Sequence, residues 1–388
     1  MDVSVYISRR LKFKGGIVMT CIAVSYFVMI IAVAVSHGFR TEIRDGISEI
    51  SGDIQLTPPD LNVLDCSHPL EWNAPYLPYI RKVDGVQKVL PVIYRAGIIR
   101  QDGNIHGVLF KGVENVRDSL PLAVSIPERL SQISGLKEGD RMTAYFIGDK
   151  VRVRQFNIAS VYNALVETDD RLLVYADIDD LRRLEGWTEN QVSSLEIILD
   201  MDHKNENDIS ELTQEIGAFV NAYSSDSESP VVAVSSVSRN PQLFDWLDLI
   251  DFNVLFILVL MTIVAGFNMI SGLLIMLFEN ISTIGLLKSL GMTDKAISKV
   301  FLSSAGVLVA KGMFIGNALA FLFCWIQDKT HLLRLDPENY FVSFVPVDLS
   351  VWSVVCADVL SFAVIMLLLL LPALFISRVD PAQTVRVK

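Results

Sequence analysis

The chain has 388 residues, of which 51% are hydrophobic, and its mean hydropathy of +0.42 is too high for an ordinary soluble domain. Its formal net charge of −11 argues against a nucleic-acid partner, because binding to phosphates requires an excess of Lys and Arg. The apolar residues are concentrated in a few long runs, so we expect a membrane protein.

Four apolar runs are long enough to cross a bilayer, which takes about 20 residues of helix. We predict transmembrane helices at residues 17–38, 249–278, 300–326 and 351–376. The alternation of a transmembrane strand is absent from these runs, so a barrel is not expected. The first run is longer than the core of a signal peptide, which favours an uncleaved signal anchor over a cleaved leader.

Residues 39–248 form one long segment of mixed α and β character between the first two spans. Ile43, Ile47 and Ile50 lie at helical spacing and predict that the first helix continues outward as a charged stalk. Runs rich in β-branched and aromatic residues predict strands at 53–57, 86–93, 105–112, 141–146, 151–160, 172–176, 195–199 and 231–235. Helices are expected at 74–83, 127–134, 178–185 and 209–223, with Asp177 and Asp208 as N-caps. Gly148-Asp149 predicts a tight hairpin.

Lys and Arg set the expected orientation. The basic N-terminus 1–16, the loop 279–299 and the tail 377–388 hold ten of them, whereas the loop 327–350 holds two. By the positive-inside rule the first three segments are cytoplasmic, and the long segment and the loop 327–350 lie on the other side. The predicted fold class is a membrane protein with four transmembrane α-helices in a 1+3 order. A large α+β extracytoplasmic domain lies between helices 1 and 2.

Signals of catalysis are nearly absent from the sequence. No glycine is followed by Lys, so the P-loop that binds ATP phosphates cannot occur. The five histidines form no HExxH pattern, and no GxSxG pattern indicates a hydrolase. We therefore expect no catalytic, cofactor-binding or metal-binding residue on this chain, and no enzymatic activity of its own.

Among the polar residues within the predicted spans, Lys311, Asn268 and Asp358 stand out as candidates for a function or a pairing. A charge at the centre of a bilayer costs about 2.5 kcal/mol or more, so a partner is expected. At about 1.5 Å per residue, Lys311 and Asn268 lie at similar depths, whereas Asp358 is displaced by roughly 12 Å. We expect Lys311 to reach Asn268 or carbonyls near Gly266 rather than Asp358. The alternative is that it snorkels to the cytoplasmic side.

Small residues recur every four positions on the third span. Gly312, Gly316 and Ala320 occupy positions i, i+4 and i+8. This spacing predicts a face on which another helix packs closely.

Residues 279–299 form a short amphipathic segment joined to two spans. On a helix, one side carries Ile281, Ile284, either Leu287 or Lys288, and Gly291. Gly285 and Gly291 would let a partner surface approach closely. The alternative is an interfacial helix that rests on lipid.

The IGLLKSLGM core of this segment, Ile284–Met292, resembles the coupling segment of the FtsX/MacB/LolC group of permeases, the type VII ABC transporters. Further landmarks that match the group are FKGVE at Phe110–Glu114, Leu335–Val347, and SRVDPAQTVR at Ser377–Arg386. The resemblance covers the full chain and is closest to the LolC/LolE lipoprotein-releasing permeases.

The resemblance implies a multi-pass permease subunit in the bacterial inner membrane, with a MacB-type periplasmic core domain. It also implies a separate LolD-like ATPase dimer that carries ATP and Mg and contacts Glu279, Ile281, Ile284, Gly285, Lys288 and Gly291. A second permease copy, in a homodimer or a LolC/LolE-like heterodimer, would flank a cavity open to membrane lipids. The substrate would be a lipoprotein, passed to a LolA-like periplasmic chaperone.

One difference from LolC bears on the expected contact with the chaperone. In LolC a long proline-bearing hook grips LolA, whereas the matching hairpin Ala144–Arg152 is short and has no proline. Either the chain is the LolE-like partner, or handover uses another surface. The alternatives within the group are a MacB-like exporter and an FtsX-like regulator of cell-wall hydrolases. An alternative of another class is a membrane sensor with a ligand-binding periplasmic domain.

Overall fold

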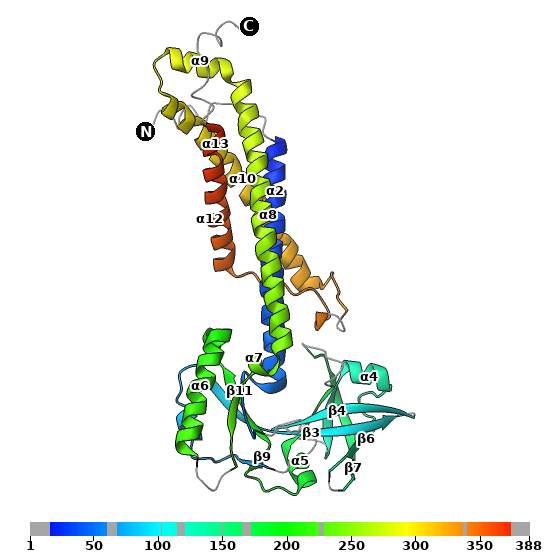
Figure 1. The fold of residues 1–388 in the computed structure, drawn as a ribbon. Helices are drawn as coiled ribbons and strands as arrows, with labels where there is room; N and C mark the ends of the chain where they lie inside the picture. Colours follow the sequence, from blue (N-terminus) through cyan, green and yellow to red (C-terminus); the bar gives the residue numbers. More distant parts are fainter. Residues whose placement is uncertain are drawn as a thin grey trace. The chain divides into compact units, whose positions relative to one another are not determined.

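The computed structural model describes residues 16–59, 68–101, 103–114, 121–148, 150–164, 172–224, 229–336 and 340–373 (Figure 1). The chain divides into two compact units. The helical unit comprises Met1–Arg40, Trp246–Arg334 and Phe344–Lys388, and the α+β unit comprises Thr41–Asp245 and Leu335–Ser343. The predicted cytoplasmic tail 377–388 and almost all of the basic N-terminus lie outside the described residues.

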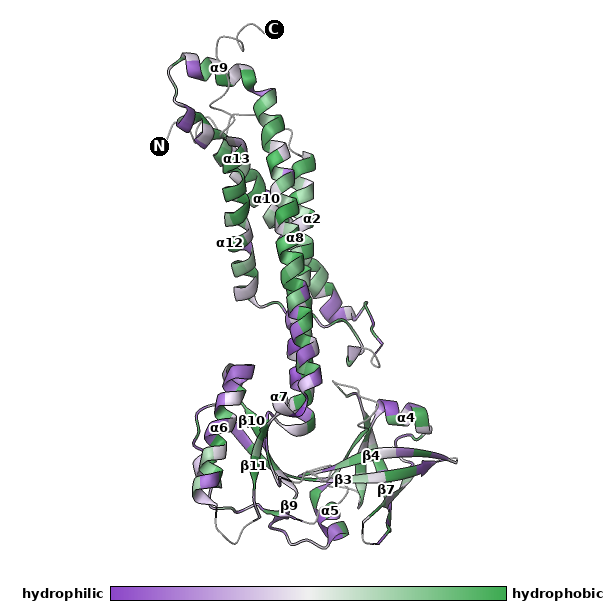
Figure 2. Ribbon diagram, viewed as in Figure 1, coloured by the Kyte–Doolittle hydropathy of each residue, from purple (hydrophilic) through white to green (hydrophobic). Residues whose placement is uncertain are grey.

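Four helices in the described residues are long and apolar enough to cross a membrane. They are α2 (Gly16–Ser51), α8 (Pro241–Glu279), α10 (Asp294–Thr330), and α12 (Val351–Leu368) with the short α13 (Leu370–Ala373). Figure 2 shows the long apolar stretch of each. Together with the α+β unit, they confirm the predicted fold class.

The helical unit has an apolar core to which every span contributes. Tyr26 of α2, Met269 of α8, Phe301 of α10 and Ile365 of α12 are each at most 2% exposed and belong to one cluster. A hydrogen bond from the Ser361 hydroxyl to the Tyr26 hydroxyl, 3.1 Å long, adds a polar link between α12 and α2. The four spans therefore pack as one bundle.

The α+β unit is built on a nine-stranded sheet in the order β11-β1-β10-β3-β4-β8-β5-β7-β6. Its strands are β1 (Ile54–Thr57), β3 (Val86–Gln101), β4 (Asn104–Val113), β5 (Ala123–Pro127), β6 (Arg141–Phe146), β7 (Arg152–Tyr162), β8 (Leu173–Asp177), β10 (Ser194–Leu199) and β11 (Val232–Ser235). A separate ribbon pairs β2 (Leu70–Glu71) with β9 (Gln191–Val192). Because β3 also pairs with β6, the strands from β3 to β6 close into a ring.

Short helices cover this sheet. They are α3 (Leu77–Ile80), α4 (Glu128–Ser134), α5 (Ile178–Glu185), the 3-10 turn Met201–His203, α6 (Glu206–Tyr223) and α7 (Ser236–Arg239). Asp177 caps α5 as predicted, because its side chain accepts a hydrogen bond from the Asp179 N–H. The predicted cap at Asp208 is wrong, since α6 begins earlier, after Asn205.

Two further predictions differ from the structure. The strand expected at 86–93 continues to Gln101, because its second half pairs with β4 while its first half pairs with β10. The helix expected at 74–83 is reduced to the single turn α3. The predicted turn residue Asp149 lies outside the described residues.

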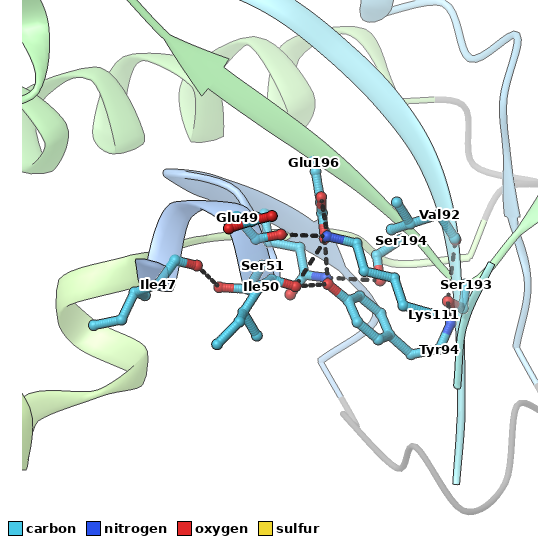
Figure 3. A network of polar contacts seen from close by, with 11 residues as sticks. Ile47, Glu49, Ile50, Ser51, Val92, Tyr94, Lys111, Ser193, Ser194 and Glu196 are labelled. Atoms are coloured by element: carbon cyan, nitrogen blue, oxygen red, sulfur yellow. Dashed lines mark hydrogen bonds and ion pairs between the residues drawn. The ribbon is translucent and has the colours of Figure 1, made fainter. Parts of the chain in front are cut away.

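A buried polar network holds the C-terminal end of α2 within the α+β unit (Figure 3). Lys111 Nζ donates to the backbone oxygens of Glu49 and Ile50, at 2.9 and 3.0 Å, and pairs with Glu196. Tyr94 contacts Glu196 and places its hydroxyl 2.7 Å from the Ile50 oxygen. The last carbonyls of a helix lack intrahelical partners, so this network satisfies groups that burial would otherwise penalise.

Candidate functional site

The predicted coupling segment contains one helix, α9 (Ile281–Ser289), between α8 and α10. Gly291 follows it with a φ of +90°, a left-handed conformation that favours glycine, and this lets the chain turn toward α10. Across the turn, Lys288 Nζ lies 2.9 Å from Asp294 Oδ1, in the first turn of α10. The segment is therefore fixed to the helix that follows it.

The inner face of α9 differs from the surface expected for partner contact. Ile284 is 1% exposed and belongs to the core cluster of the bundle, together with Ile297 and Phe301 of α10. Gly285 is buried as well. These two residues were expected to contact a partner, but they lie inside the helical unit. The expectation failed because helical spacing shows which residues share a side of the helix and not which side faces inward.

The other predicted coupling residues of this segment are more exposed to solvent. Glu279 and Gly291 are exposed, and Ile281 and Lys288 are partly buried. Two leucines that were not predicted are exposed large apolar residues of the segment, Leu286 at 58% and Leu290 at 75% exposure. Large exposed apolar side chains beside a charged turn are the signal that could have identified them.

The face of α10 that carries small residues packs against α2. A Cβ at Gly312 would lie 2.7 Å from Ile22 Cγ2, and one at Gly316 would lie 2.5 Å from the Ala23 oxygen. Ala320 is fully buried in a cluster with Ile30. Both glycines thus allow the backbones of α2 and α10 to approach closely.

The intramembrane polar residues are arranged differently from the expectation. Lys311 is exposed on the surface of the unit, and in the described part of the chain no hydrogen bond or ion pair joins it to Asn268, which is partly buried, or to Asp358. Gly312 faces α2, so its neighbour Lys311, about 100° around the helix, points elsewhere. The predicted pairing with Asn268 is absent from this structure.

Asp358 has a partner that sequence reasoning missed. Asn317 Nδ2 donates to Asp358 Oδ2 at 2.5 Å, which links α10 to α12. The depth of each residue along its helix could have indicated this pair. Asn317 lies roughly 9 Å along α10 from Lys311, close to the displacement expected for Asp358.

A second missed cluster lies where α2 reaches Arg40, which we call the Arg40 end of the bundle. Arg40 Nη2 lies 2.8 Å from Asp248 Oδ1 and 2.6 Å from Asp251 Oδ2, both on α8. His37 Nδ1 lies 2.9 Å from Asp348 Oδ2. These residues lie at or just beyond the ends of the predicted spans, where oppositely charged groups on neighbouring helices can meet. The cluster ties α2 to α8 and to the segment before α12.

Comparison with known proteins finds a family model and several relatives that resemble this chain. Residues 255–381 match the FtsX-like permease C-terminal family. The lipoprotein-releasing system transmembrane protein LolC of Xylella fastidiosa strain Temecula1 is 21% identical over 396 residues, covering 94% of this chain and 92% of that protein. LolC of Neisseria meningitidis serogroup B is 21% identical over 420 residues, covering 97% of this chain and 96% of that protein.

Similar solved structures were also found, each of which covers about half of the chain. The periplasmic region of MacB from Actinobacillus actinomycetemcomitans covers 49% of this chain and 91% of its own, with 12% identity and a TM-score of 0.31. The extracellular domain of the ABC-type transporter YknZ from Gram-positive bacteria covers 47% of this chain and 99% of its own, with 13% identity and a TM-score of 0.30.

Proposed function

We propose that this chain, an ABC-transporter permease of the FtsX, MacB and LolC type, is the transmembrane subunit of a complex that releases lipoproteins from the bacterial inner membrane. The similarity to LolC extends over 94% of the chain, across both units and not only the permease domain. Its hydrophobic spans and periplasmic α+β domain suit a protein that acts on membrane-anchored substrates. We further propose that both termini are cytoplasmic.

The observation that carries this proposal is the structure of α9. Its inner side is part of the bundle core through Ile284, and Lys288 fixes it to α10, while Leu286 and Leu290 remain open. Such a helix can receive a push from a partner and pass it to the spans without bending first. Partner ATPases are general for permeases of this type, so we propose that a LolD-like ATPase dimer, which would carry ATP and Mg, binds the exposed side of α9.

Extraction of a lipoprotein requires energy from ATP, because its acyl chains hold it in the membrane. Burial of each CH₂ in a membrane contributes ~0.8 kcal/mol, so a lipoprotein with several acyl chains does not leave spontaneously. We propose that a second permease copy completes the cavity from which the chains are expelled. Because only five residues separate β6 from β7, a LolA-like chaperone would dock on another surface or on the partner permease.

Reconstitution tests this function directly. The chain is co-expressed with its partner ATPase, incorporated into proteoliposomes that carry a triacylated lipoprotein, and assayed for lipoprotein released into solution with a LolA-like acceptor present. We expect release that depends on ATP. Hydrolysis of ATP without any release would contradict the proposal. Hydrolysis that responds to a cell-wall hydrolase instead would support the FtsX-like alternative.

A further inference from the structure

A cavity of about 380 Å³ opens between α2, α8 and α12 at the Arg40 end of the bundle. All of its lining residues belong to the helical unit. Polar groups line one part of it, namely Ser36, His37, Arg40 and Asp251, and apolar side chains line the rest, among them Val33, Leu255, Leu258 and Leu360. Its volume is within the range of small-ligand sites, which is roughly 300–1,000 Å³.

The polar and apolar parts of the cavity are separated along the helix axes. α2 and α8 are antiparallel, since Arg40 contacts Asp251 at one end while Val18 packs on Gly272 toward the other. On α8, Asp251 and Leu258 are separated by roughly 10 Å along the axis. The charges therefore gather at the Arg40 end, and the apolar wall extends toward the middle of the membrane. An amphiphile with its head at the Arg40 end matches this order.

The charges of the polar part favour a head group that carries a cation. The described contacts bring three carboxylates, Asp248, Asp251 and Asp348, around the guanidinium of Arg40 and the ring of His37. Only Asp251 of the three lines the cavity, and with the other two the cluster around Arg40 and His37 carries an excess of negative charge. Asp251 accepts hydrogen bonds from the Ser36 hydroxyl on one oxygen and from Arg40 on the other. Its side chain is still 44% exposed, so a cation can approach the open side of its carboxylate. Charge complementarity therefore disfavours a purely anionic lipid.

We infer that this cavity binds one glycerophospholipid with an ammonium head group, of the phosphatidylethanolamine type. The ammonium lies near the carboxylate of Asp251, the phosphate lies on the side of Arg40 and His37, and one acyl chain follows Leu255, Leu258 and Leu360. α12 supplies the third wall within a single chain, so no second copy is needed. The site requires only that the bundle spans a membrane, so failure of lipoprotein release would leave it standing.

Photo-crosslinking of the full-length chain tests this site. The protein is placed in phosphatidylglycerol nanodiscs that contain, at equal low mole fraction, either a phosphatidylethanolamine or a phosphatidylglycerol probe with a diazirine in its acyl chain. Crosslinked peptides are mapped by mass spectrometry. We expect the ethanolamine probe to label residues 251–258 and 353–360 about fivefold more than the glycerol probe, the size expected of one partly exposed ion pair.

Matched variants of α8 separate the site from general lipid contact. Leu255→Trp fills the cavity and should remove labelling of 353–360, whereas Leu260→Trp, an exposed leucine on the same helix outside the cavity, should leave it unchanged. Leu360→Trp repeats the filling from α12. Asp251→Asn should bring the two probes to equal labelling while labelling persists. Equal labelling by both probes in the unmodified protein, or unchanged labelling in both filling variants, would overturn the assignment.

Discussion

Lys111 and Glu196 form an ion pair inside the α+β unit, with Nζ 2.9 Å from Oε2 and side-chain exposures of 4% and 2%. The same ammonium donates to two carbonyls at the end of α2. One buried charge therefore serves both the sheet and the helix that continues into the bundle. Lys111 belongs to the FKGVE stretch, so its position on β4 assigns a structural role to that sequence.

Loss of this lysine should be strongly destabilising. Lys111→Met leaves the Glu196 carboxylate buried without its partner, and breaking such a pair costs about 3–5 kcal/mol. The measurement is denaturant unfolding of the full-length chain in detergent, followed by a probe of the α+β unit. Lys88→Met, the same substitution at an exposed position of β3, is the control. Equal midpoints for the two variants would show that the pair contributes nothing.

The stability of the α+β unit should fall with rising pH because of Glu196. Burial raises the pKa of the Glu196 carboxyl above its ordinary value of 4.5, although Lys111 and Tyr94 oppose the shift. The folded state then binds more protons than the unfolded state, so the free energy of unfolding decreases as the pH rises from about 4.5 toward the folded pKa. The check is the unfolding free energy across this range in wild type and in Glu196→Gln. The difference between the two proteins should change with pH, and a constant difference would refute the prediction.

Substitution of Gly316 should separate α10 from α2. In Gly316→Ala the new Cβ would meet the Ala23 oxygen at 2.5 Å, and overpacking of this kind costs about 1–3 kcal/mol. Thermal melting of the detergent-solubilised protein measures the loss. Gly306→Ala on the same helix is the control, because its Cβ would meet only the flexible end of Met366, at 3.4 Å. If the two variants melt together, α2 and α10 are not in close backbone contact.

The two faces of α9 should respond differently to a polar side chain. Leu290→Ser changes an exposed residue and should weaken association with the partner ATPase without lowering the melting temperature. Ile284→Ser changes a core residue and should lower the melting temperature, because large-to-small core substitutions reduce the free energy of unfolding by about 2–5 kcal/mol. Co-purification and melting are measured for both variants. A Leu290→Ser protein that retains the ATPase would exclude this face from the contact.

Much of the architecture could be predicted from the sequence, because membrane spans and strands depend on local patterns. Apolar length predicted the four spans, and most strands followed from runs of β-branched residues. The extent of β3 could not be predicted, because it is set by pairing with three strands, of which β6 and β10 are distant in sequence. The spacing of Gly312 and Gly316 indicated a packing face, but only the structure gives α2 as its partner.

The candidate site was harder to predict, because it depends on which side of a helix faces inward. The amphipathic pattern of residues 279–299 placed Ile284 on a surface for a partner, whereas in the structure it belongs to the core cluster that contains Phe301. Asn317 and Arg40 were missed because their importance comes from carboxylates on other helices, Asp358 and Asp251. Depth along each helix carries that information only in part, since it does not give rotation about the axis.

The closed ring of strands that begins at β3 and ends at β6 has a consequence for aggregation. Because β6 returns to β3, the described part of the nine-stranded sheet ends in a single free edge, at the four-residue β11. α6 lies against this strand, where Gly217 approaches Ala233. Free edges invite other chains to add strands and aggregate. The ring therefore leaves the described part of the sheet with one edge in place of two at which a second chain could add a strand.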